Sequence, residues 1–358
     1  MRFVLKTRYA QDVDFFKHNG QRFWYGLLGL FVFVAPFLLD DFYTGELSLV
    51  FIYAIAGIGL MLLVGYTGLV SLGHAAFLAI GAYAHAYFMT EGAPFMVSLI
   101  GATAVCVVIG AIVGIPSLRM TGIYLAVATL AFAQIVEKVL AHWESVTGGH
   151  RGMAVPEPEI ISWSLGTPRA FYFLVLLVLI GALFCALNLL RSPTGRAMIA
   201  IRDSEISAQA MGINLARVKT TSFAVSAGFT GLAGGLLAHK IGYLAPDAFT
   251  ILISIQLLLM VVVGGLGSMH GVIYGAVFIG LLPQGIAFLR ESLPAGIGQI
   301  PGLEPGIFGL ILVLFLVYEP LGIFGRWIKI RLFFSEFPLY RKSTYKRQKS
   351  YLRTERVH

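Results

Sequence analysis

The chain has 358 residues, of which 58% are hydrophobic and only 12% are charged, and its mean hydropathy is +0.82. Soluble globular proteins carry about 25% charged residues, so this composition indicates an integral membrane protein. It excludes a disordered chain, a collagen-like repeat and a disulfide-rich secreted domain. Cys106 and Cys185 both lie in long apolar runs, where a structural role is expected rather than a metal site or an extracellular disulfide. The net charge of +8 would also suit a nucleic-acid-binding protein, so the positions of the charges along the chain must distinguish the two classes.

The first 22 residues form a basic segment, and the apolar run after it is expected to be a retained helix rather than a cleaved signal peptide. Residues 47–90 then contain no Asp, Glu, Lys or Arg. One helix of that length would reach about 66 Å, roughly twice the hydrocarbon core of a bilayer. The run is therefore predicted to fold back at the glycine-rich segment 65–73. Residues 248–289 are also uncharged and are predicted to fold back at 264–271.

The remaining apolar runs complete a prediction of an all-α, polytopic membrane protein with about ten transmembrane helices. Continuous apolar runs of about 20 residues favour helices over barrel strands, which alternate over about 10 residues. The predicted transmembrane domain covers residues 23–324, between basic segments 1–22 and 325–358. Its spans are 23–39, 47–64, 72–89, 94–115, 121–141, 170–190, 220–238, 249–266, 271–289 and 306–324.

The distribution of Lys and Arg orients the chain, because positive charge resists translocation. With both termini in the cytoplasm, all 26 of these residues fall inside except Lys138, Arg151, Arg169, Lys240 and Arg290. Residues 142–168 then form the largest periplasmic loop, and residues 191–219 form the longest internal cytoplasmic loop. The tail from 325 is basic and aromatic, which suits anionic lipid headgroups better than nucleic acid. Topology accounts for the net charge, and no nucleic-acid partner is expected.

Several sequence signals of chemistry or energy coupling are missing. The sequence contains no Gly-Lys dipeptide, and so no Walker A loop, and it contains no HExxH or CxxC motif. We therefore expect no enzyme, no metal site and no cofactor in this chain. Charges within the spans are scarce: Glu137, Lys138 and Glu319 all lie near an interface. A proton or sodium relay normally needs intramembrane charges, so an energised partner is favoured over a self-energised carrier.

The glycine-rich turns are candidates for a translocation pathway. Irregular backbone at membrane depth persists only where protein groups or a water-filled cavity form hydrogen bonds with its N–H and C=O groups. In the first turn the candidates are Thr67, Ser71 and His74, and in the second they are Gly267 and Ser268. Membrane spans that glycines interrupt at corresponding places in the two halves of a chain point to a central binding site. The alternative is that these small residues permit close helix packing, with His74 a hydrogen-bonded core histidine.

The cytoplasmic loop 191–219 contains its own helix signals. Asp203 or Ser204 can cap a short helix that Gly212 ends. Such a helix, apolar on one side, suits docking into a groove of a cytoplasmic partner. An amphipathic linker lying on the lipid surface is the alternative. If the helix docks, Glu205→Arg or Gly212→Leu should abolish transport while the protein still inserts normally.

Several segments together resemble the LivM-type permeases of ABC importers for branched-chain amino acids and related small solutes. They are GYTGLVSLGHAAFLAIGAY (65–83), RMTGIYLAVATLAFAQI (119–135), TGGHRGM (147–153), the segment 192–236 that begins SPTGRAMIAIRDSEISAQAMGINLARVK, and GGLGSMHGVIYGA (264–276). Their order and spacing match from about residue 47 to 324.

The resemblance implies a heteromeric importer in a bacterial inner membrane. Its partners would be a LivH-type permease, two cytoplasmic ATP-binding subunits that hydrolyse the ATP, and a periplasmic solute-binding protein. The solute is expected to be a branched-chain amino acid, or else urea, a short amide or an aromatic acid. The alternative is a gradient-driven carrier or channel, and a membrane enzyme is third.

The resemblance also assigns roles to individual residues. Coupling to the ATPase falls to Arg202, Glu205, Ala208 and Gly212, in a loop similar to the EAA loop of ABC permeases. Tyr124 and Thr129 join the translocation candidates. The periplasmic loop contributes Thr147, Gly148, Gly149 and Gly152.

Overall fold

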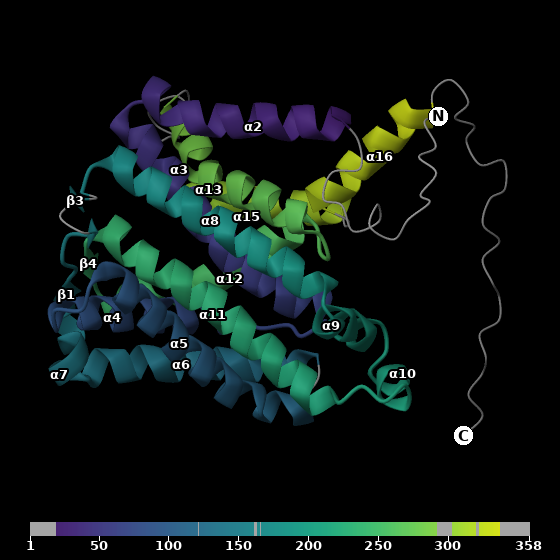
Figure 1. Ribbon diagram of the computed structural model, residues 1–358, viewed down its shortest axis with the longest axis horizontal. Helices are drawn as coiled ribbons and strands as arrows, with labels where there is room; N and C mark the ends of the chain where they lie inside the picture. Colours follow the sequence, from purple (N-terminus) through teal and green to yellow (C-terminus); the bar gives the residue numbers. More distant parts are fainter. Residues whose placement is uncertain are drawn as a thin grey trace.

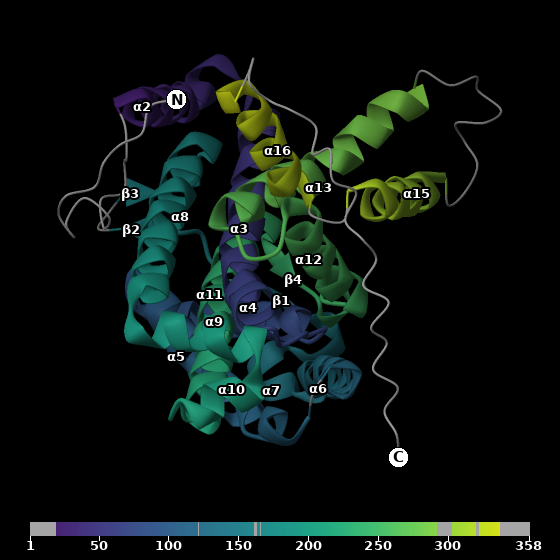
Figure 2. The ribbon, with the colours of Figure 1, turned by 90° about the vertical axis from the view of Figure 1, so that its right-hand side faces the viewer.

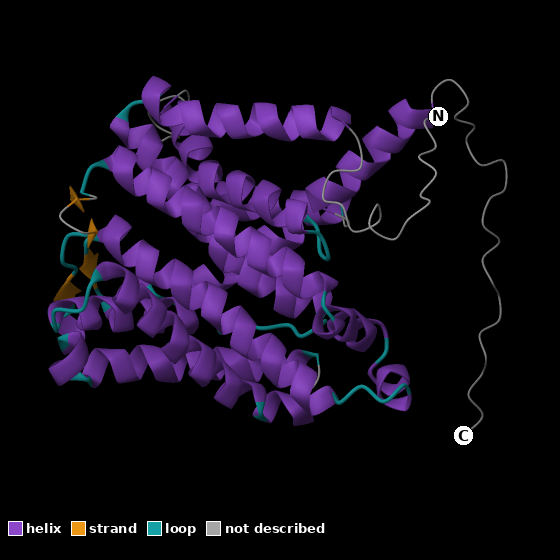
Figure 3. Ribbon diagram, in the orientation of Figure 1, coloured by secondary structure: helices purple, strands orange, loops and turns teal. Residues whose placement is uncertain are grey.

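The computed structural model describes residues 19–120, 122–160, 163–164, 166–291, 303–319 and 322–336. Within these ranges the chain is almost entirely helical, with four two-residue strands at one end of the molecule (Figure 3). The predicted basic segment before residue 19 and the tail beyond residue 336 lie outside the described residues. The all-α class predicted from composition is confirmed.

Ten helices follow the ten predicted spans in order. They are α2 (Asn19–Leu38), α3 (Asp41–Leu60), α4 (His74–Thr90), α5 (Phe95–Gly114), α6 (Ile123–His142), α8 (Pro168–Arg191), α11 (Leu215–Ile241), α12 (Ile251–Gly264), α13 (Met269–Glu291) and α15 (Leu303–Tyr318). Among the described residues, seven helical segments are long and apolar enough to cross a membrane, and they include α3, α5, α6, α8, α11, α12 and α13. The chain is therefore a multi-pass membrane protein, and the count of ten crossings stays a prediction.

Shorter elements gather at the two ends of the helical bundle (Figure 1). One end carries α7 (Glu144–Thr147), the 3-10 helices η3 (Gly149–Arg151) and η4 (Pro246–Ala248), and the strands β1 (Met153–Ala154), β2 (Glu159–Ile160), β3 (Trp163–Ser164) and β4 (Tyr243–Leu244). β1 pairs antiparallel with β4, and β2 with β3. The opposite end carries α9 (Pro193–Asp203) and α10 (Glu205–Ala210). The two long predicted loops therefore lie at opposite ends, as the proposed topology requires.

Helices α3 and α11 form the centre of the bundle, and they are the most deeply buried of the candidate spans. Helix α4 crosses α11 at glycines. A Cβ atom added to Gly81 would lie 2.2 Å from the carbonyl oxygen of Gly231, so the backbones touch directly. Small residues permit such approaches between membrane helices and strengthen their packing. By contrast, α6 lies at the edge of the bundle in both views (Figures 1 and 2).

Both predicted fold-back points are confirmed. A π-helical turn, η1 (Met61–Tyr66), extends α3 before irregular backbone leads into α4 at His74. Gly68 adopts φ +77° there, a conformation that favours glycine. The second turn runs from the end of α12 at Gly264 to the start of α13 at Met269.

The last predicted span ends earlier than the sequence suggested. Helix α15 stops at Tyr318, and a separate helix, α16 (Gly322–Glu336), begins the predicted tail. The carboxylate of Glu319 lies between them, 2.7 Å from Arg326 and 3.7 Å from Lys329. The basic residues that follow the span thus pair with its terminal acid.

Candidate functional site

Three predicted pathway residues are buried around the first turn, where each makes hydrogen bonds, and we call them the buried cluster. Thr67, Ser71 and His74 are each exposed by 2% or less. Ser71 Oγ lies 3.1 Å from His74 Nδ1, and Thr67 donates to the carbonyl oxygen of Leu62. In this conformation the cluster is sealed from solvent and holds the irregular backbone in place.

The partners of this cluster come from distant helices. His74 Nε2 lies 2.8 Å from Ser226 Oγ, and Thr67 Oγ1 lies 3.2 Å from Ser222 Oγ, and both serines are on α11. The backbone N–H of Ala75 donates to Ser254 Oγ on α12. Sequence reasoning missed these serines, although Ser222 and Ser226 recur four residues apart and so share one face of α11. His74 is thus fully hydrogen-bonded, as the packing alternative expected, while its role in translocation stays a prediction.

Thr129 joins this cluster from α6, whereas Tyr124 does not. Thr129 accepts a hydrogen bond from the backbone N–H of Leu72 at 3.0 Å. It also lines an apolar cavity of about 280 Å³ between α5 and α6. Tyr124 is 79% exposed on the outer face of α6. The two residues that one motif supplied therefore face different surroundings.

The second turn lies against the first. The backbone N–H of Gly267 donates to the sulfur of Met61 at 3.3 Å, so the π-helical turn meets the α12–α13 connection. Ser268 is buried and accepts from the N–H of Gly271 at the start of α13. The structure therefore brings the two predicted glycine-broken turns together at one place in the fold.

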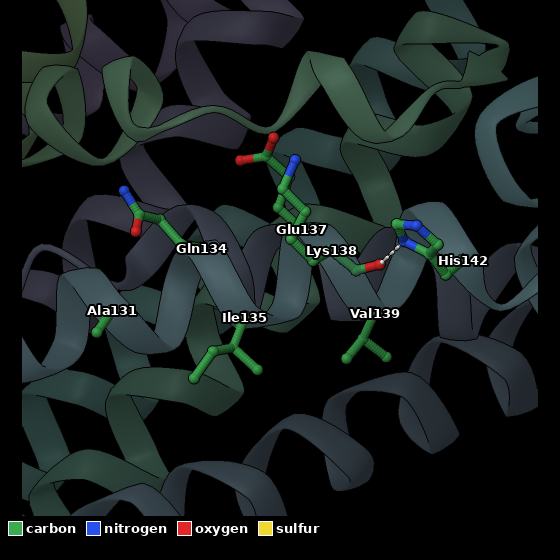
Figure 4. A pocket seen from close by; sticks show the side chains of 7 residues that line it. All are labelled: Ala131, Gln134, Ile135, Glu137, Lys138, Val139 and His142. Atoms are coloured by element: carbon green, nitrogen blue, oxygen red, sulfur yellow. Dashed lines mark hydrogen bonds between the residues drawn. The ribbon is translucent and has the colours of Figure 1, made fainter.

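An open cavity of about 820 Å³ lies along the second half of α6, from Ala131 to His142 (Figure 4). Gln134, Glu137, Lys138 and His142 line it together with apolar residues of the same helix. Figure 4 shows Gln134 and Glu137 on one side of the helix, with Ile135 and Val139 on the other. Lipid disfavours exposed polar side chains, which in membrane proteins usually face a partner or a water-filled cavity. Gln134 was not predicted, and it lies about 12 Å along the helix from His142.

The predicted cytoplasmic helix is α10, and Ser204, rather than Asp203, is its N-cap. Ser204 Oγ accepts from the N–H of Ser207 at 3.2 Å. Ala208 is buried in a small apolar cluster with Met198, Ile201 and Val218. Glu205 pairs with Lys219 of α11, with Oε2 and Nζ 2.7 Å apart. The two predicted coupling residues that lie on α10, Glu205 and Ala208, thus contact the rest of this chain.

The outward face of α10 carries residues that the sequence reasoning did not select. Ile206 is 83% exposed and Met211 is 85% exposed. Gly212 is also exposed and adopts φ +84°, as predicted for a helix-ending glycine. The helical spacing of Ile206 against buried Ala208 is the signal that could have found this face.

The predicted loop residues at the other end form a compact turn. Thr147 is buried, and its hydroxyl donates to the carbonyl oxygen of Leu140 at 2.6 Å. Gly148, Gly149 and Gly152 all have positive φ angles. A Cβ atom on Gly152 would lie 2.0 Å from the carbonyl oxygen of Leu244. These residues therefore fix the C-terminal end of α6 beside the C-terminal end of α11.

Comparisons with known proteins identify the family of the chain. Residues 43–316 match the family model described as branched-chain amino acid transport system / permease component. The chain belongs to this family. It is 33% identical to the high-affinity branched-chain amino acid permease LivM of Salmonella typhimurium over 313 residues, 80% of this chain and 71% of the relative. The identity to Escherichia coli LivM is the same over the same shares.

A second type of relative in this family is LivH. The Escherichia coli LivH permease is 25% identical over 295 residues, which cover 76% of this chain and 91% of the relative. No solved structure matches the chain. The chain is thus a LivM-type permease subunit of an importer, and its family includes permeases of both types.

Proposed function

We propose that this permease is the LivM-type half of a heteromeric ABC importer in a bacterial inner membrane. A LivH-type permease would complete the membrane part, two cytoplasmic subunits would hydrolyse ATP, and a periplasmic protein would deliver the solute. The solute would be a branched-chain amino acid or a related small solute. The observation that carries this proposal is α10, a capped helix with an exposed apolar face at the end of the bundle opposite the strands.

The outward face of α10 is the proposed docking surface for the ATPase. Ile206 and Met211 present large apolar side chains almost fully to solvent. Ala208 and Glu205 fix the opposite face against α9 and α11. A short helix held in this way inserts its apolar residues into a groove of a partner protein. This arrangement favours docking over a linker lying loosely on lipid.

The docking proposal is tested by copurification of the assembled importer. Ile206→Glu and Met211→Glu should each lower ATPase copurification and uptake, because a charge enters an apolar contact. Asn188→Asp is the control, since Asn188 is exposed on α8, outside the docking surface, and the new charge there should leave both unchanged. Glu205→Arg is a poorer test than the sequence suggested, because it places a second cation beside Lys219. Normal copurification of both glutamate variants would refute the docking surface.

For the solute pathway we propose the exposed face of α6, with Tyr124 towards one end and Gln134 and Lys138 towards the other. A LivH-type partner, built on a related sequence, would cover this face and enclose the cavity. The buried cluster at His74 would then support α6 through Thr129 rather than touch the solute. Gln134→Leu should lower uptake without lowering thermal stability, because Gln134 is exposed in the isolated subunit. Ile180→Leu is the control, because Ile180 is exposed on α8 and does not line this cavity.

The solute is best identified through the binding protein that copurifies with the importer. Branched-chain amino acids, urea, short amides and aromatic acids are the candidates for a binding titration. ATP-dependent uptake of the bound solute into proteoliposomes would support the proposal. Uptake that persists without any ATP-binding subunit would instead support a gradient-driven carrier or channel.

A further inference from the structure

Arg202, the penultimate residue of α9, contacts both glycine-broken turns. Its Nη1 donates to the carbonyl oxygen of Gly65 at 2.9 Å. A Cβ atom on Gly68 would lie 3.2 Å from its Cγ. A Cβ atom on Gly267, in the second turn, would lie 3.1 Å from its Nη1. One side chain of the cytoplasmic loop therefore lies against the place where α3 ends and where α12 and α13 connect.

The charge of Arg202 suits this position. The last carbonyl groups of a helix lack helical partners and carry partial negative charge, so a cation stabilises them. The rest of the guanidinium is fixed by Asp203, whose Oδ1 lies 3.3 Å from Nε and 3.2 Å from Nη2. A lysine has no planar fork and cannot make both sets of hydrogen bonds. Nη1 is thus directed to the turns, while the side chain as a whole is 38% exposed.

We propose that Arg202 is a positioning residue that joins α10, the coupling helix, to the two turns. The helix and the turns would then move as one body when the ATPase moves α10. The inference rests on the proposed function, because it presumes that α10 receives the motion of an ATPase. It adds the step inside the permease: the motion reaches the ends of α3, α12 and α13 through one guanidinium. The contact to Gly65 would therefore persist through the transport cycle.

The first test compares ATP hydrolysis with uptake in the complete importer reconstituted in proteoliposomes. Arg202→Ala should leave ATPase copurification unchanged but lower the solute imported per ATP hydrolysed by about tenfold, a typical size for coupling between two sites. Arg202→Lys should lie between this variant and wild type. Arg196→Ala is the matched control, because Arg196 lies on the same helix and donates to Arg191 at the surface.

The second test replaces the guanidinium with a disulfide. A Cβ atom on Gly68 would lie 3.6 Å from the Cβ of Arg202, within the range that disulfides span. The variant Gly68→Cys with Arg202→Cys is made on a Cys185→Ser background, because Cys185 is the exposed native cysteine. Gly68→Cys alone on this background is the reference, because φ +77° at Gly68 strains any side chain placed there. When reduced, it should hydrolyse ATP with little uptake. When oxidised, it should recover uptake to within about threefold of the Gly68→Cys reference, because the covalent bond restores the connection.

The outcomes separate the inference from the proposed function. If the wild-type complex shows no ATP-dependent uptake, the proposed function fails. If wild type works and Arg202→Ala lowers hydrolysis and uptake equally, or lowers neither, the inference alone is overturned. A double-cysteine variant that cross-links but stays uncoupled, while Gly68→Cys alone transports, also overturns it. Thermal unfolding of each variant in detergent excludes loss of fold as the cause.

Discussion

The ion pair between Glu205 and Lys219 predicts a specific pattern of stability changes. Lys219 is 2% exposed and Glu205 is 37% exposed, with their charged atoms 2.7 Å apart. Removing one member of a buried pair leaves an uncompensated charge, which costs about 3–5 kcal/mol. Because water reaches Glu205, Glu205→Gln should cost less, about 2–3 kcal/mol of the free energy of unfolding.

The double variant Glu205→Gln with Lys219→Met should be less destabilised than Glu205→Gln alone. It leaves no unpaired charge, so its free energy of unfolding should lie within about 1 kcal/mol of wild type. The matched control is the exposed pair of Asp41 and Arg169, whose side chains are 67% and 54% exposed. Asp41→Asn should cost less than about 1 kcal/mol.

The assay is equilibrium unfolding in mixed micelles, with thermal melting as a check on the order of the variants. Two results would refute the reasoning. One is a cost for Glu205→Gln as small as that for Asp41→Asn. The other is a double variant whose loss equals the sum of the two single losses, because the charges would then not be interacting.

Three further predictions concern packing and buried hydrogen bonds. Gly264→Ala should destabilise the protein by at least about 2 kcal/mol, because its Cβ would lie 2.0 Å from a carbonyl oxygen of α13. Gly181→Ala is the control in the same melting assay and should be tolerated, because nothing lies within 4 Å of its Cβ. Ser226→Ala should cost about 1–3 kcal/mol by leaving His74 Nε2 without its partner, and an unchanged melting curve would contradict this. Thr147→Val should cost a similar amount and speed limited proteolysis of the outer loop, because a buried hydroxyl with three hydrogen bonds is lost.

The sequence determined the helices and turns where local chemistry leaves few alternatives. The two long uncharged runs had to fold back, and in each the only interruption was a glycine cluster. Ser204 and Gly212 are a helix cap and a helix stop, and the structure uses both. The resemblance to LivM-type permeases then supplied the function, because the quoted segments occur in the same order in that family.

The sequence did not determine which side of each element faces the protein. Ala208 was assigned to the coupling contact but lies in the core, and exposed Ile206 was overlooked. The pairing of Glu205 with Lys219, and of His74 with Ser226, joins residues that only tertiary packing brings together. The strands β1 and β4 have two residues each, too few for a periodic signal.

Helix α11 runs without a break from Leu215 to Ile241, a length of about 40 Å. Near one end it holds Lys219, which binds the coupling helix, and beyond the other it continues into β4. A rigid rod pivoting at its midpoint by about 10° would displace its two ends by about 3.5 Å in opposite directions. Spin labels at the two ends, measured with and without ATP, would detect this lever and would show no such opposite shift if α11 stays fixed. Closure on one side of the membrane and opening on the other would then be a single mechanical event, without a sequence of separate switches.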